Sequence, residues 1–88
     1  MPERIYVRVN SDFDQTGFMM PRSITWEDGR TFKIDKVRDF RPASMYRKGM
    51  PGQCYTVIIK GEIRHLFFQK TGDMFPAHVG RWFVEREN

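Results

Sequence analysis

The sequence of 88 residues contains a single cysteine, Cys54, two histidines and no long apolar run. One thiol can neither close an internal disulfide nor build a thiolate metal cage, and His65 and His78 are not a close-spaced ligand pair. We therefore expect no metal site, no cofactor and a reducing compartment, with Cys54 as a small buried apolar residue. Residues 1–9 interleave charged and apolar side chains, which predicts no signal peptide or spanning helix and indicates a cytoplasmic protein without membrane contact.

Sequence motifs of catalysis are missing as well. The chain has no G-x-S-x-G nucleophile elbow and no glycine-rich phosphate loop that leads into a helix. Asp12, Asp14, Glu27 and Asp28 supply carboxylates in pairs, but turn formation and solubility explain all four. Cys54 lacks local support as a nucleophile, although a Cys–His pair assembled in space stays open. These absences predict a non-enzymatic protein.

The formal net charge of +4 is unevenly distributed along the chain. Residues 1–40 carry seven basic and seven acidic side chains, and residues 61–88 carry four of each. The whole excess lies in residues 41–60, in Arg41, Arg47, Lys48 and Lys60. Such a local cluster indicates a polyanionic or acidic partner, with an ordinary solvated loop as the alternative.

Length and periodicity predict one β domain spanning residues 1–88, because a second domain would have to fold on roughly 40 residues without disulfides or metal. Ile5, Val7 and Val9 alternate with polar residues and Phe13 continues their phase, which predicts a first strand at about residues 4–13. A loop is expected at about 14–22, because residues 14–17 have turn chemistry and Pro21 would disrupt a central ladder.

Residues 23–34 are typical of a β-hairpin. Whether its loop has an odd or an even number of residues decides which side chains share a face. Ile24 shares a face with Phe32 if the loop has three residues, Glu27-Asp28-Gly29, with Gly29 at positive φ in a G1 bulge. A two-residue Asp-Gly turn, the alternative, would put Phe32 on the other face. The apolar phase slips after Ile34, which indicates a bulge or bend near Asp35 and Lys36.

The remainder predicts another hairpin, a final strand and two further loops. Residues 41–53 and 70–79 lack periodicity and are rich in proline and glycine, so they are expected to be loops. Residues 55–59 and 63–68 flank a Lys60-Gly61 turn and are apolar on both faces, which is typical of strands covered twice, strands in a barrel or strands at an interface. Residues 80–85 form the last strand. The expected fold is an all-β, SH3-like small antiparallel barrel or strongly curled sheet of five or six strands.

Surface binding is the function that these features favour. Small barrels bind single-stranded nucleic acid by stacking bases on aromatic rings beside a basic groove. The aromatic and cationic residues suited to this role are Tyr6, Arg8, Arg41, Tyr46, Arg47, Lys48 and Lys60. They predict binding to nucleic acid or to a nucleic-acid-processing protein. In the alternative interpretation Tyr6 packs under a loop, Tyr46 anchors its own loop, and the hairpin 55–68 is the interface of a protein–protein module, a homodimer included.

Four stretches carry a resemblance to a known family: MPRSITWEDGRTFKI (20–34), VRDFRPA (37–43), CYTV (54–57) and GRWFVE (80–85). Through them the chain resembles a family of small bacterial proteins of unknown function that is common in Firmicutes, and the resemblance covers most of its length. Genes of such proteins are associated with those of Y-family translesion DNA polymerases. The resemblance therefore implies an accessory role in DNA repair, with no catalytic residues to carry over.

Overall fold

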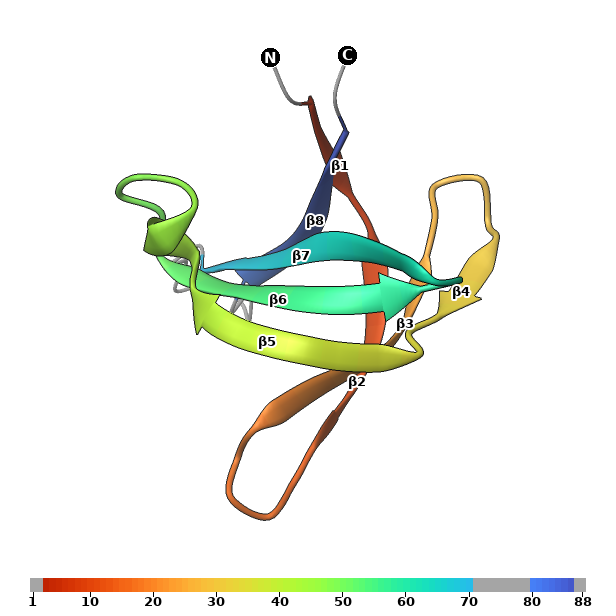
Figure 1. Cartoon of the computed structure of the whole chain (residues 1–88), viewed down its shortest axis with the longest axis horizontal. Coiled ribbons are helices and arrows are strands. Elements are labelled where there is room, and N and C mark those ends of the chain that lie inside the picture. Colours follow the sequence, from red (N-terminus) through yellow and green to blue (C-terminus); the bar gives the residue numbers. More distant parts are fainter. Residues whose placement is uncertain (1–2, 71–79, 87–88) are drawn as a thin grey trace.

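The computed structural model describes residues 3–70 and 80–86 and places them in eight strands and one short 3-10 turn (Figure 1). In chain order the elements are β1 (Glu3–Tyr6), β2 (Arg8–Phe13), β3 (Met19–Thr25), β4 (Thr31–Lys33), β5 (Lys36–Pro42), η1 (Ala43–Met45), β6 (Gly52–Ile59), β7 (Glu62–Lys70) and β8 (Gly80–Arg86). Within the described part of the chain, no helix is long and apolar enough to cross a membrane.

The strands form two antiparallel sheets. The large sheet has the order β1-β8-β7-β6-β5, and the small sheet has the order β2-β3-β4. The predicted all-β class is confirmed. The described residues form two open sheets, so they make neither a closed barrel nor a single curled sheet of five or six strands. The SH3-like architecture stays a prediction.

The first predicted strand, residues 4–13, is divided between the two sheets at Val7. The Val7 N–H still donates to the Trp82 carbonyl of the large sheet at 3.1 Å, whereas Arg8 already pairs with Thr25 of the small sheet. Ile5, Val7 and Val9 nevertheless contact the same apolar core. One alternating pattern therefore covers two strands, because both sheets face a common interior.

The predicted loop at 14–22 is too long, since β3 begins at Met19. The tight turn depends on Asp14, whose carboxylate accepts the backbone N–H groups of Thr16 at 2.8 Å and Phe18 at 3.0 Å. Pro21 is buried inside β3, next to a register shift in β2 between Asn10 and Ser11. A strand tolerates proline beside such an irregularity, because a ladder hydrogen bond is already missing there.

The hairpin prediction for residues 23–34 is confirmed, with its three-residue turn. Ile24 opposes Phe32, the Trp26 N–H donates to the Arg30 carbonyl at 2.7 Å, and Gly29 has a φ of 91°. A bend at residues 34–35 follows, where the chain passes from the small sheet to the large one. The register shift itself lies further on, between Val37 and Asp39.

The predicted second hairpin and the final strand are also confirmed, as β6–β7 and β8. Both turn residues of the hairpin have positive φ, 52° at Lys60 and 77° at Gly61, as a two-residue type I′ turn requires. Of the predicted loop at 70–79, Lys70 belongs to β7 and residues 71–79 lie outside the described residues.

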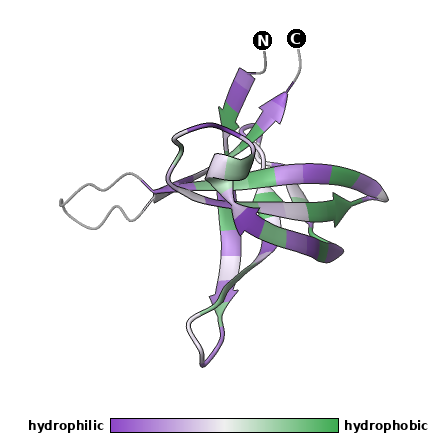
Figure 2. Cartoon of the chain, turned by 60° about the vertical axis from the view of Figure 1, so that its left-hand side comes forward, coloured by the Kyte–Doolittle hydropathy of each residue, from purple (hydrophilic) through white to green (hydrophobic). Residues whose placement is uncertain are grey.

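The two apolar faces of the large sheet carry separate cores, so the expectation of strands covered on both faces is confirmed. One core lies between the sheets and consists of Ile5, Ile24, Ile34, Tyr55, Val57, Leu66 and Val84. The other core lies on the opposite face and consists of Ala43, Met50, Cys54, Phe67 and Phe83, with Tyr46 packed against it. Figure 2 shows the corresponding alternation of hydrophobic and hydrophilic residues along the strands.

The predicted loop at 41–53 is shorter than expected and is partly buried rather than exposed. Its two ends, Arg41–Pro42 and Gly52–Gln53, belong to strands β5 and β6. Between them, the Ala43 carbonyl accepts the N–H groups of Tyr46 and Arg47, both at 2.9 Å. Ala43 and Met50 are buried, so the segment covers the second core rather than extending into solvent.

Candidate nucleic-acid interface

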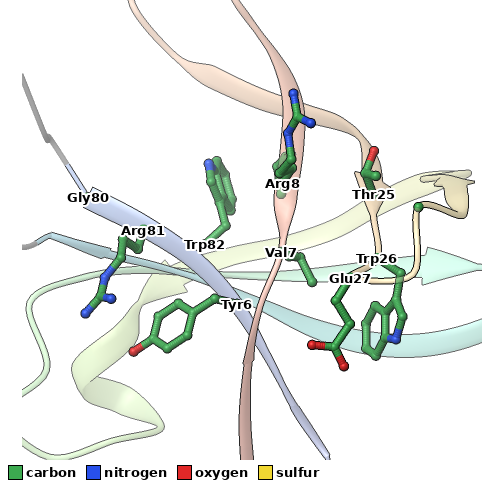
Figure 3. Close-up of a pocket in the computed structure, with 11 residues that line it drawn as sticks. Tyr6, Val7, Arg8, Thr25, Trp26, Glu27, Gly80, Arg81 and Trp82 are labelled. Carbon is green, nitrogen blue, oxygen red and sulfur yellow. The ribbon is translucent and has the colours of Figure 1, made fainter.

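A groove opens where the chain passes from β1 in the large sheet to β2 in the small one (Figure 3). We call it the crossover groove. Its volume is about 670 Å³, and three separate stretches of chain line it. The lining residues are Tyr6, Val7, Arg8, Val9, Thr25, Trp26, Glu27, Gly29, Gly80, Arg81 and Trp82.

Three aromatic side chains give the crossover groove flat apolar surfaces. Tyr6 is 41% exposed. Its ring packs edge-to-face with the Phe83 ring at a centroid distance of 5.7 Å, and the Arg81 guanidinium lies 4.4 Å from the centroid of the Tyr6 ring. Trp82 is held more firmly, because it packs on Phe68 at 4.9 Å and on Tyr55 at 5.6 Å. Trp26 packs against the core between the sheets. In Figure 3, Tyr6 and Arg81 lie on one side of β8 and Trp82 lies on the other.

The charge of the groove comes from two arginines without acidic partners. Arg8 and Arg81 are exposed, and neither side chain forms an ion pair or hydrogen bond with any residue of the described ranges. Two arginines of the β2–β3–β4 region do have acidic partners, in the pairs Arg22–Asp12 at 2.9 Å and Arg30–Asp28 at 2.7 Å. The groove therefore offers two cations without ion-pair partners beside aromatic faces, and Glu27 is the acidic side chain in its lining.

A second, smaller hollow of about 370 Å³ lies beside the segment that follows η1. Its lining consists of Arg4, Arg47, Lys48, Gly49, Met50, Pro51 and Gln69. Arg4 lies over the Phe83 ring at 4.8 Å, but Arg47 is bound to Glu85 through both carboxylate oxygens and also donates to the Tyr46 carbonyl at 2.7 Å. Arg47 thus holds the segment after η1 onto β8. The other two cations in the lining, Arg4 and Lys48, take no part in this ion pair.

The structure does not bring the seven predicted binding residues together. Tyr6 and Arg8 line the crossover groove, whereas Arg47 and Lys48 line the second hollow. Tyr46 packs between His65 at 5.1 Å and Phe67 at 6.2 Å, so it anchors its own segment as the alternative interpretation held.

Arg41 and Lys60 lie at opposite ends of the β5–β6 pair and belong to neither hollow. Arg41 binds Asp39 at 2.6 Å and opposes Cys54, while the Lys60 ammonium lies 4.9 Å from the centre of the Phe32 ring. The six residue steps from Cys54 to Lys60 span about 20 Å of extended chain. The seven predicted residues therefore lie on separate parts of the surface, and their role in binding stays a prediction.

Sequence analysis missed Arg4, Trp26, Arg81 and Trp82 as site residues. The adjacent Arg81-Trp82 pair repeats the cation-beside-aromatic pattern that selected Tyr6 and Arg8, and this signal was available. What the sequence does not reveal is the pairing of Tyr6 with Phe83 in β1–β8, which places Arg81 at the Tyr6 ring.

Cys54 and His65 do approach each other, with the thiol sulfur 3.6 Å from His65 Nδ1. Cys54 is only 1% exposed, and burial raises the pKa of its thiol to about 12. A neutral buried thiol is a poor nucleophile, and neither residue lines the two hollows. No group of three metal-ligating side chains occurs within residues 3–70 and 80–86; His78 lies outside them.

The hairpin 55–68, the alternative protein interface, buries four of its large apolar side chains inside the chain itself. Tyr55, Val57, Leu66 and Phe67 are at most 2% exposed, and Ile63 is 54% exposed. The structure thus uses this hairpin as the centre of the large sheet.

The fold and the crossover groove define a small all-β protein in which two open antiparallel sheets frame a cationic, aromatic groove. No protein-family profile, curated protein or solved structure matches this chain.

Proposed function

We propose that this protein is a non-enzymatic binder of single-stranded nucleic acid and that the crossover groove is its binding surface. The observation that carries the proposal is the combination of exposed Tyr6 with the unpaired cations Arg8 and Arg81. Nucleobases stack on aromatic rings whatever their sequence, and arginines bind the phosphates between them. The partly exposed Trp26 and Trp82 offer further stacking surface.

An extended strand suits the shape of this site. The groove is open and is lined from three stretches of chain, so it can accept a segment that passes through it. A duplex keeps its bases stacked inside, where Tyr6 cannot reach their faces. Single strands should therefore bind more tightly than duplexes of the same sequence.

The resemblance to proteins encoded near translesion polymerases extends this proposal. An accessory protein of DNA repair meets exposed single strands, and the crossover groove would be its contact with them. Binding to the nucleic-acid-processing enzyme itself would then use another surface of the same molecule.

Fluorescence anisotropy with labelled single-stranded and double-stranded oligomers, at low and physiological salt, tests the proposal. The double variant Arg8→Gln/Arg81→Gln should bind at least about tenfold more weakly, and its plot of log K against log salt should be shallower by about 1.4, because two phosphate contacts are lost.

The matched control removes two cations outside the groove, Lys36→Gln/Arg38→Gln. Both side chains are exposed, both lie on β5, and the variant loses the same two positive charges as the groove variant. If the two double variants lose the same affinity, binding depends on net charge alone and the groove is not the site.

A further inference from the structure

Glu27 is the acidic side chain in the lining of the crossover groove. It is exposed, and it forms no hydrogen bond or ion pair with the rest of the described chain. Its neighbour Asp28 stabilises the turn, because the Asp28 carboxylate accepts hydrogen bonds from the Arg30 backbone N–H at 3.0 Å and from Arg30 Nε at 2.7 Å. The β3–β4 turn therefore does not use the Glu27 carboxylate.

A carboxylate in a groove that binds phosphates lowers the affinity by repulsion unless it receives hydrogen bonds from the ligand. An ionised carboxylate only accepts hydrogen bonds, and it has two oxygens. The base that fits it best presents two adjacent donors. Guanine does so on its Watson–Crick edge, with N1–H and the N2 amino group side by side.

The other bases match this acceptor pair less well. Adenine and cytosine place one amino donor next to a ring-nitrogen acceptor, and thymine and uracil place one N–H between two carbonyl oxygens. In each case a lone pair of the base would face a carboxylate oxygen. Each well-made bidentate contact discriminates against the wrong base by about fivefold or more.

The position of Trp26 adds the stacking surface that such a contact needs. Trp26 directly precedes Glu27 and lines the same groove. Figure 3 shows both side chains extending in the same direction from the β3–β4 turn, opposite to the direction of Arg8. A base laid against the indole would have its edge near the carboxylate, and the cations would remain available for the flanking phosphates.

We propose that the crossover groove selects guanine within single strands, with Trp26 as the stacking surface, Glu27 as the acceptor of N1–H and N2–H, and Arg8 and Arg81 as the phosphate contacts. This inference rests on the proposed nucleic-acid binding and adds base selectivity to it.

The test compares labelled thymidine heptamers that carry guanine, hypoxanthine, adenine or cytosine at the central position. One guanine per strand prevents association between strands through guanine. We expect the guanine heptamer to bind about five- to tenfold more tightly than the adenine and cytosine heptamers. Hypoxanthine, which keeps N1–H and lacks the amino group, should lie in between.

The variant Glu27→Gln should reduce the guanine preference to less than about twofold, because the amide offers one acceptor and one donor. It should also bind the all-thymidine heptamer more tightly, since a negative charge leaves the groove. The control Glu62→Gln removes the same charge from an exposed position beside the β6–β7 turn and should keep the preference.

The outcomes separate the two proposals. Equal, salt-dependent affinity for all heptamers would overturn guanine selection and leave binding in the groove intact. A guanine preference that persists in Glu27→Gln would overturn the role of Glu27. Failure of every heptamer to bind at low salt would overturn both proposals.

Discussion

Arg47 and Arg41 show that the number of cations in a stretch of sequence does not predict which cations are free to bind a phosphate. Both belong to the segment that carries the whole excess charge, yet Arg47 is bound to Glu85 and Arg41 to Asp39. Arg8 lies in a segment whose net charge is zero, and it has no acidic partner within the described residues. The partner of each arginine, rather than the local sum, decides which ones can meet a phosphate.

The Arg47–Glu85 pair gives a prediction for stability. The Arg47 side chain is 40% exposed, so water screens the pair; the charge reversal Arg47→Glu should lower the free energy of unfolding by about 1 kcal/mol. Urea unfolding measures this change. The swap Arg47→Glu/Glu85→Arg should recover most of the loss; a swap as unstable as the single variant would contradict an ion pair at this position.

Cys54 gives a prediction for alkaline pH. Burial raises the pKa of its thiol from 9.0 to about 12, so the unfolded chain releases the proton first as pH rises. The contribution of the protonated Cys54 thiol to the free energy of unfolding is complete below pH 9 and is lost between pH 9 and 12. Over that range the free energy of unfolding falls by at most about 1.4 kcal/mol per pH unit. Burial raises the pKa of Tyr55 as well and adds to the loss with the same sign.

The control for this prediction is Cys54→Ala, studied by urea unfolding in reducing buffer from pH 8 to 11. The variant loses packing at every pH, but its free energy of unfolding should decline less steeply above pH 9 than that of the natural protein. Parallel curves for the two proteins would show that the thiol ionises equally in the folded and unfolded chains.

Among the elements, the two hairpins were predictable because local chemistry fixes them. Gly29 and the Lys60-Gly61 pair supply the positive φ values that the turns need, and the alternation of apolar residues sets the register. The division at Val7 was not predictable, since it depends on Trp82, a residue 75 positions later that receives the Val7 hydrogen bond. Pro21 was misread because a register shift in the partner strand accommodates it.

Gly52, at the start of β6, gives a prediction at this scale. Its φ is 117°, and a Cβ there would overlap the Phe68 carbonyl oxygen of β7 and lie 3.0 Å from the Lys70 nitrogen. Gly52→Ala should therefore cost about 3 kcal/mol, the sum of backbone strain and overlap. Gly17 also has positive φ, 88°, but a Cβ there meets nothing within 4 Å of the described structure.

Gly17→Ala is therefore the matched control, with an expected loss of about 1 kcal/mol from backbone strain alone. Urea denaturation of both variants measures the difference. Equal losses would mean that β6 and β7 separate easily at this point and that the close approach has little energetic weight.

At the scale of the whole molecule, the crossover groove exists because two sheets meet. Tyr6 and Arg8 come from the chain that leaves one sheet for the other, Trp26 and Glu27 come from a turn of the small sheet, and Arg81 comes from β8. The sequence indicated Tyr6 and Arg8 through alternation and composition. It did not indicate that Arg81 and Trp82 line the same groove, because the β1–β8 pairing joins the two ends of the described chain.

The location of the binding surface is the central claim, and NMR chemical-shift mapping with the thymidine heptamer tests it most directly. The two tryptophans of the chain both line the groove, so their indole N–H signals should shift, together with the amides of Tyr6, Arg8 and Arg81. The amides of Lys48 and Gly49 should stay in place. Shifts confined to Lys48, Gly49 and Met50, with unmoved indole signals, would contradict the account and place the contact on the segment after η1.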